Sequence, residues 1–141
     1  MNIIDSYKSE DDKTYTVVKC TPNGTFTGTV SISKDDEEFA CDINGYRFAE
    51  CKADIQDMRV NKDKLKQRYI EAKHLLYVAE NSNNDQVLVK FLKHQMNIAL
   101  RDYEEANKHY KTMRDSFRQF TDDENKKRAE FLKKYKEKQN K

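Results

Sequence analysis

Residues 92–120, LKHQMNIALRDYEEANKHYKTMRDSFRQF, carry apolar side chains at alternating steps of four and three. This spacing places a continuous apolar stripe along one face of an α-helix, as in coiled coils. The stripe consists of Leu92, Met96, Ala99, Tyr103, Ala106, Tyr110, Met113, Phe117 and Phe120. The pattern therefore predicts a helix over residues 85–120, which would be about 50 Å long.

A shorter helix is predicted upstream, over residues 54–80. Its apolar face repeats the same spacing and consists of Leu65, Tyr69, Ala72, Leu76 and Ala79. Between the two helices, the polar segment NSNND, residues 81–85, reads as a loop that supplies an N-cap for the longer helix. The two segments together predict a pair of long antiparallel helices.

The difference in helix length predicts self-association. Folded back on the longer helix, the shorter one stops about 15 Å before its partner ends. It cannot cover the apolar stripe around Met113, Phe117 and Phe120. A second copy of the chain is the simplest cover, because a two-fold axis lets each overhang cover the other. We therefore expect a homodimer or a higher homo-oligomer that assembles through the long helices.

The first third of the chain predicts an antiparallel sheet, because it holds all three glycines and the only proline. The segment KTYTVVKC, residues 13–20, is rich in β-branched residues. TPNG, residues 21–24, follows it with the Asn-Gly pair that is typical of hairpin turns. TFTGTVSI, residues 25–32, alternates apolar residues or glycine with hydroxyl side chains, which indicates a half-buried strand.

Two further strands are expected after this hairpin. FACDI, residues 39–43, is the first of them, and YRFAEC, residues 46–51, follows a second Asn-Gly pair at 44–45. Residues 1–12 are expected to form a loose arm or a short first segment. Residues 13–52 therefore predict an antiparallel meander of about four strands.

A capping signal predicts where the longer helix ends. Thr121 and Glu124 have the T-x-x-E spacing of a capping box. We therefore expect a break at residues 120–121 and a short terminal helix or tail over residues 121–138. The whole chain, residues 1–141, is predicted to form a single α+β domain with an antiparallel meander, two long antiparallel helices and a short terminal helix.

The charge is nearly balanced, with 27 basic and 25 acidic residues, which argues against a general polyanion-binding surface and against specific nucleic-acid binding. No run approaches the ~20 apolar residues that a membrane helix needs. The N-terminus lacks the basic and apolar regions of a signal peptide. The three cysteines match no metal-ligand spacing. We expect a cytoplasmic protein with reduced thiols and no membrane contact.

The sequence shows no catalytic motif. The three histidines, His74, His94 and His109, lie on predicted helices without an H-E-x-x-H pattern, and are expected at the surface. A phosphate-cradling glycine loop and a G-x-S-x-G turn are both missing. We therefore predict that the protein is not an enzyme and that it needs neither a cofactor nor a metal ion.

Two arginines suggest a binding site instead. Arg114 and Arg118 are four residues apart, so they share one helix face beside the uncovered stripe. Lysine is the commoner basic residue in this chain, and a guanidinium binds phosphate in a bidentate way and stacks on rings, as an ammonium does not. The alternative is an interhelical salt bridge to a Glu or Asp side chain, for example Asp115 or Asp122.

Asn97 flanks the same stripe about 25 Å from Arg114, too far for one chain to bring both to a small ligand. Two antiparallel copies would place Asn97 of one chain opposite Arg114, Arg118 and Asp122 of the other. An amide, two guanidiniums and a carboxylate suit base edges, phosphates and ribose hydroxyls. Phe91 is our candidate for stacking on a base, although it could instead cap the helical hairpin.

In its architecture over residues 13–120, the chain resembles the first family of phage anti-Thoeris proteins. The spacing of Asn97, Arg114, Arg118 and Asp122 is similar to that of the amide, arginines and aspartate with which that family contacts its ligand. The resemblance implies a small intracellular phage protein that assembles through its helices. It also implies sequestration, without cleavage, of a glycocyclic ADP-ribose signal; some members also bind cyclic oligonucleotides of CBASS defence.

The leading hypothesis is therefore a sponge, a protein that binds and sequesters a cyclic ADP-ribose-type immune signal, and which could also bind cyclic oligonucleotides. An alternative is a phage structural or assembly accessory protein that docks a partner through its coiled-coil helices. A third interpretation is a weak nucleic-acid-binding module that uses the basic residues after position 125.

Overall fold

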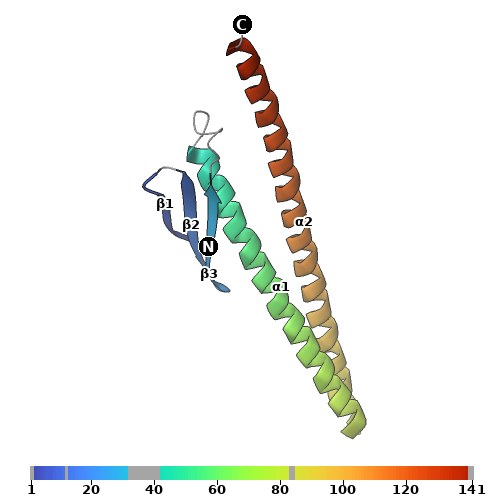
Figure 1. Ribbon diagram of the computed structural model, residues 1–141. Coiled ribbons are helices and arrows are strands. Elements are labelled where there is room, and N and C mark those ends of the chain that lie inside the picture. Colours follow the sequence, from blue (N-terminus) through green and yellow to red (C-terminus); the bar gives the residue numbers. More distant parts are fainter. Residues whose placement is uncertain (1, 12, 32–41, 83–84, 140–141) are drawn as a thin grey trace. The chain divides into compact units, whose positions relative to one another are not determined.

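The computed structural model describes residues 2–11, 13–31, 42–82 and 85–139 (Figure 1). The elements in chain order are the strands β1 (Asn2–Lys8), β2 (Thr14–Thr21) and β3 (Gly24–Ser31) and the helices α1 (Asp42–Ser82) and α2 (Gln86–Gln139). The predicted α+β class is confirmed, with a sheet followed by two long helices packed together. The internal contacts define a first unit, Met1–Tyr110, and a second unit, Lys111–Lys141.

The predicted hairpin between residues 13–20 and 25–32 is confirmed. β2 and β3 pair in antiparallel register from Thr14 opposite Ser31 to Thr21 opposite Gly24. Gly24 has a φ of 133°, which residues with a Cβ rarely adopt. The backbone N–H of Asn23 donates to Thr21 Oγ1 over 3.1 Å and closes the turn. The Asn-Gly signal was therefore read correctly at this turn.

The N-terminal segment is a strand, which agrees with the short first segment that was one of our two alternatives for residues 1–12 and not with a loose arm. β1 pairs antiparallel with β2, with a bulge between Ile3 and Asp5. The sheet order is β1-β2-β3, which leaves β2 in the centre. The backbone hydrogen bonds to β2 stabilise this strand, and they could not be predicted from the composition of the short segment.

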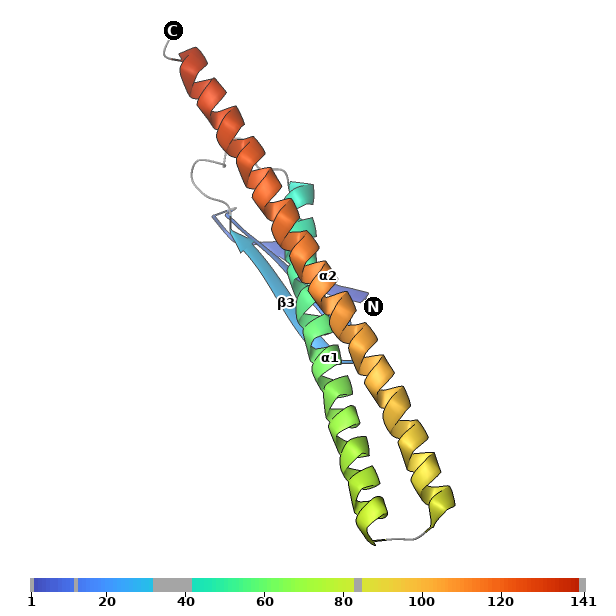
Figure 2. The same cartoon turned by 90° about the vertical axis from the view of Figure 1, so that its right-hand side faces the viewer.

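The core lies between one face of the sheet and the N-terminal half of α1, which runs beside β3 (Figure 2). Tyr15 and Val17 project from this face of β2 and pack against Ala49 of α1. All three are at most 1% exposed. At Gly28 of β3, an added Cβ would lie only 1.7 Å from the carbonyl oxygen of Ala49. Glycine is therefore required for the strand and helix backbones to approach this closely.

Residues 46–51 belong to α1, so the predicted fourth strand is wrong. The helix begins at Asp42 instead of residue 54. Ala49 and Ala53, one helical turn apart, are at most 1% exposed. Packing of this helical face against the sheet outweighs the strand propensity of the local sequence. Of the predicted third strand, residues 39–41 lie outside the described residues, and residues 42 and 43 belong to α1.

The second Asn-Gly pair, at residues 44–45, lies within α1 and forms no turn. A Cβ at Gly45 would lie 2.5 Å from ring atoms of Tyr15. The same ring meets Tyr46 edge-on, with the ring centroids 5.1 Å apart. Gly45 is thus explained by close packing against Tyr15.

The longer helix begins close to the predicted start but does not end where we predicted. The Asp85 carboxylate accepts hydrogen bonds from the backbone N–H groups of Val87 and Leu88, at 3.0 and 3.3 Å, and so caps α2. The helix then continues to Gln139. Thr121 Oγ1 donates to the carbonyl oxygen of Phe117 over 2.7 Å, a bond found inside helices. The predicted break at 120–121 and the separate terminal helix over 121–138 are wrong.

Within the first unit, α1 and the part of α2 that ends at Tyr110 lie side by side and antiparallel (Figures 1 and 2). Leu76 and Ala79 of α1 are buried, whereas the predicted stripe of α2 is half-buried from Leu92 to Tyr110. No residue of α2 is buried, among those that the structure describes. Neither described helix contains an apolar stretch long enough to cross a membrane.

Candidate functional site

The predicted arginine site lies in the second unit, on one stretch of α2. Arg114 is half-buried, and its Nε donates to Asp115 Oδ1 over 3.2 Å. Arg118 follows one turn later and is exposed, as is Asp122 one turn beyond. Asp115 is one of the two partners named in the salt-bridge alternative, but this pair joins adjacent residues of α2, so an interhelical bridge remains a prediction. An ion pair this exposed contributes little free energy, so an anionic ligand could compete with Asp115 for the guanidinium.

The other two predicted site residues lie in the first unit. Asn97 is exposed on α2. Phe91 is 57% exposed near the start of the same helix. A large apolar ring with this exposure is available to a ligand or partner. The predicted juxtaposition of Asn97 with the arginines of a second copy remains a prediction.

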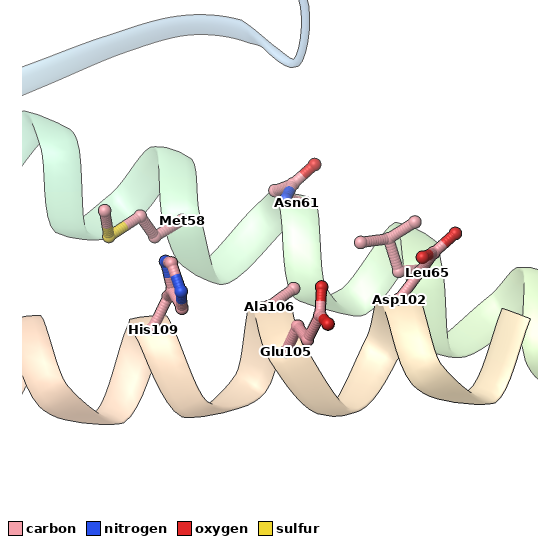
Figure 3. A pocket seen from close by; sticks show the side chains of 7 residues that line it. All are labelled: Met58, Asn61, Leu65, Asp102, Glu105, Ala106 and His109. Carbon is pink, nitrogen blue, oxygen red and sulfur yellow. The ribbon is translucent and has the colours of Figure 1, made fainter. Parts of the chain in front are cut away.

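A second candidate site is a groove between α1 and α2 within the first unit (Figure 3). Its volume is about 440 Å³, in the range of small-molecule sites. Residues from both helices line it, namely Met58, Asn61, Leu65, Asp102, Glu105, Ala106 and His109. The groove thus combines apolar walls with two carboxylates, an imidazole and an amide.

The spacing of these residues explains why they meet. On α1, Met58, Asn61 and Leu65 follow steps of three and four, so they share one face. On α2, Ala106 is part of the predicted apolar stripe, and its methyl group fills little of the space between the helices. Asp102 and His109 stand four before and three after Ala106, on the same face.

We did not predict this groove from the sequence. His109 was expected at the surface, and it is indeed exposed. The signal that could have revealed the groove is a small residue on the apolar stripe with acidic residues at neighbouring helical positions. Such spacing is common in solvated helices, so it identifies a groove only when the facing residues of α1 are also known.

A charged cluster between the sheet and α1 is structural. Lys19 Nζ lies 2.7 Å from Glu50 Oε1 and 2.8 Å from Asp54 Oδ1, and Lys19 is only 6% exposed. Burial lowers the pKa of Lys19, but the hydrogen bonds and charges of Asp54 and Glu50 outweigh it, so that pKa lies above its usual value. The cluster joins β2 to α1, with the Lys19 side chain buried between them and the two carboxylates partly exposed.

The two cysteines that the structure describes show no sign of catalytic activation. Burial raises the pKa of the Cys51 thiol, and the nearby charges of Asp54 and Glu50 raise it further. The thiol is therefore kept protonated and poorly nucleophilic. Cys20 is exposed on β2 and is not in a disulfide.

The described part of the chain contains no group of three or more His, Cys, Asp or Glu side chains that could hold a metal ion. Comparison with protein families, with curated proteins and with solved structures finds no match for this chain. Any functional assignment therefore depends on the chemistry of the two candidate sites.

Proposed function

We propose that the protein is a non-enzymatic sponge that binds a cyclic ADP-ribose-type signal, and cyclic oligonucleotides as a further possible class, through its arginine-bearing helix segment. The observation that carries this proposal is the placement of Arg114 and Arg118 one turn apart, next to the aromatic residues Phe117 and Phe120. Guanidiniums recognise phosphate oxygens, and aromatic faces stack on bases. Asp122 adds an acceptor for ribose hydroxyls.

Self-association is part of this proposal. The described part of the second unit, residues 111–139, is one helix, and it exposes Met113, Phe120, Phe131 and Tyr135 to between 36% and 52%. A single helix cannot bury its own apolar side chains, so a second copy is a natural cover. An antiparallel pair would place Asn97 of one copy opposite Arg114 and Arg118 of the other.

In this arrangement, the ligand is held by groups from both copies. Asn97 remains the proposed amide contact from the other copy, as the family resemblance implies. Phe91 remains our own candidate for the stacking contact. Binding without cleavage requires no general acid or nucleophile, only donors and acceptors held in place before the ligand arrives. The proposal includes a cytoplasmic location.

The test is isothermal titration of the purified protein with cyclic ADP-ribose isomers and with cyclic di- and trinucleotides. We expect saturable binding of one class and at least tenfold weaker binding by Arg114→Ala, because each lost charge-assisted hydrogen bond costs about 1.5–3 kcal/mol. Sedimentation should show that the variant keeps the oligomeric state of the wild type.

The matched control is Arg101→Ala, since Arg101 also precedes an aspartate, Asp102, and pairs with it over 4.0 Å. This control should bind as the wild type does. Wild-type affinity in Arg114→Ala, or no binding of any nucleotide tested, would contradict the sponge assignment.

A second candidate function, a scaffold or assembly protein that docks another protein, is favoured by a different observation. The end of the helical hairpin exposes six large apolar side chains by 44–78%, namely Ile70, Leu75, Tyr77, Val78, Val87 and Phe91. Such a concentration is typical of interaction surfaces. A nucleotide ligand should raise the melting temperature of a sponge by mass action and leave that of a scaffold unchanged.

A further inference from the structure

We infer that the groove between α1 and α2 binds an aliphatic diamine or polyamine. This groove is the one lined by Met58, Leu65, Asp102, Glu105 and His109 with Asn61 and Ala106. The inference does not depend on the proposed function, because it uses none of the residues assigned to the nucleotide site. It follows from the shape of the groove, from its charge and from the contacts of the nearby cations.

The shape suits a slender, flexible molecule. The groove is open to solvent and has a volume of about 440 Å³. Met58 and Leu65 stand on α1 seven residues apart, about 10 Å along the helix. A methylene chain can lie between these apolar side chains and Ala106 without a polar group being buried. This arrangement provides hydrophobic contact for the chain between two amino groups.

The charge suits ammonium groups. Asp102 and Glu105 stand three residues apart on α2, so both carboxylates border the same groove. Figure 3 shows the Glu105 side chain projecting toward α1. Carboxylates accept charge-assisted hydrogen bonds from ammonium donors. An anionic ligand, in contrast, would meet two like charges at this position.

Two cations next to the lining residues, Arg101 and Lys62, are engaged elsewhere or only weakly paired with the groove. Arg101 Nη2 lies 4.0 Å from Asp102 Oδ1, with both side chains largely exposed, so this pair contributes little. Lys62 places its ammonium group 4.8 Å from the ring centroid of Tyr110 and 3.8 Å from Asp63. Neither contact prevents Glu105 from accepting an ammonium group of the ligand.

The test is isothermal titration of the full chain with spermidine at low ionic strength. We expect saturable binding that weakens with added salt, and affinity about fivefold lower in Asp102→Asn and in Glu105→Gln, because each removes one charged acceptor. Glu104→Gln is the matched control, since this exposed neighbour does not line the groove and its loss changes the net charge equally.

A groove-filling variant separates a specific site from general attraction of polycations. Ala106→Leu places a larger side chain in the groove, so it should reduce spermidine affinity at least fivefold while keeping the melting temperature at or above that of the wild type. Equal losses in Glu104→Gln and Glu105→Gln would overturn the inference. Unchanged affinity in a folded Ala106→Leu variant, or no saturable binding by the wild type, would overturn it as well.

Discussion

The sheet-bearing end of α1 and the helix α2 differ sharply in how far their apolar side chains are buried. At the sheet, Tyr15, Val17 and Ala49 are buried almost completely. Along α2, a longer apolar stripe contains no buried residue among those described. Side-chain burial is the main source of stability in both helices and sheets. The first region therefore supplies the stability of the fold, and the second retains apolar surface that can interact with other molecules.

The two regions also differ in the burial of their ion pairs. Beside the sheet, Lys19 is enclosed by two carboxylates at 2.7 and 2.8 Å. On α2, the ion pairs of Arg101 and Arg114 are exposed and join neighbours in the sequence. Buried pairs are costly to break, whereas exposed pairs exchange readily. Ligand recognition by charge is therefore expected on α2 and not at the sheet.

The largest loss of stability should follow from adding a side chain where the backbones of β3 and α1 come closest. Gly28→Ala places a Cβ 1.7 Å from the carbonyl oxygen of Ala49, which forces β3 away from α1. We expect a loss of about 3 kcal/mol in the free energy of unfolding, measured by urea denaturation. Thr27→Ala, at the exposed neighbour, is the control. A loss below about 1 kcal/mol in Gly28→Ala would show that the two backbones are less tightly apposed.

An intermediate effect should follow from removing the buried ammonium group. Lys19→Met leaves Glu50 and Asp54 without their shared partner, and we expect a loss of about 1–2 kcal/mol near neutral pH. The folded-state pKa of Lys19 lies above the ordinary value of 10.5. Its ion pairs therefore stabilise the fold fully below that value, and this contribution disappears as the pH rises through the folded-state pKa.

Measuring the unfolding free energy at several pH values provides the control, because the wild type and Lys19→Met share all other titrating groups. Unfolding free energies of the wild type and of Lys19→Met should differ at about pH 8 and converge as the pH rises above 10.5 and through the folded-state pKa of Lys19. A difference that stays constant across this range would mean that the Lys19 charge does not account for the loss.

The smallest effect should come from α2, where Thr121 lies inside the helix. Thr121→Ala should change the unfolding free energy by no more than about 0.5 kcal/mol, because alanine is the better helix former and the lost hydroxyl bond is local. Asp85→Ala is the comparison, since this residue does cap α2, and it should cost about 1 kcal/mol. If both variants lost the same unfolding free energy, Thr121 would act as a cap, as the predicted helix start at this residue requires.

The elements that were predicted correctly have strong local signals. The hairpin has an Asn-Gly turn whose glycine needs a positive φ, and the two helices have apolar spacing repeated over many turns. The errors arose where distant contacts decide the structure. The sequence around Gly45 indicates a turn, but in the structure this glycine makes room for the ring of Tyr15. Residues 46–51 look like a strand until the sheet is found to pack on Ala49.

The candidate sites were accessible to sequence reasoning only in part. The shared face of Arg114 and Arg118 follows from helical spacing alone, and the structure gives Arg114 a partner in Asp115. The groove required knowledge of which residues of α1 stand opposite Ala106 and Glu105. Residue spacing within one helix defines a face, but the register between two helices depends on all their contacts together.

The central position of β2 has a consequence for the dynamics of the chain. Its amide groups are protected by neighbouring strands on both sides, and α1 covers one face of the sheet. Their hydrogens should exchange with solvent only when the sheet opens, whereas amides of α2 exchange through local fraying of a helix that has no buried side chain. Parts of α2 can thus open and close many times while β2 stays intact, which would let the helix gain or release a partner without the loss of the fold.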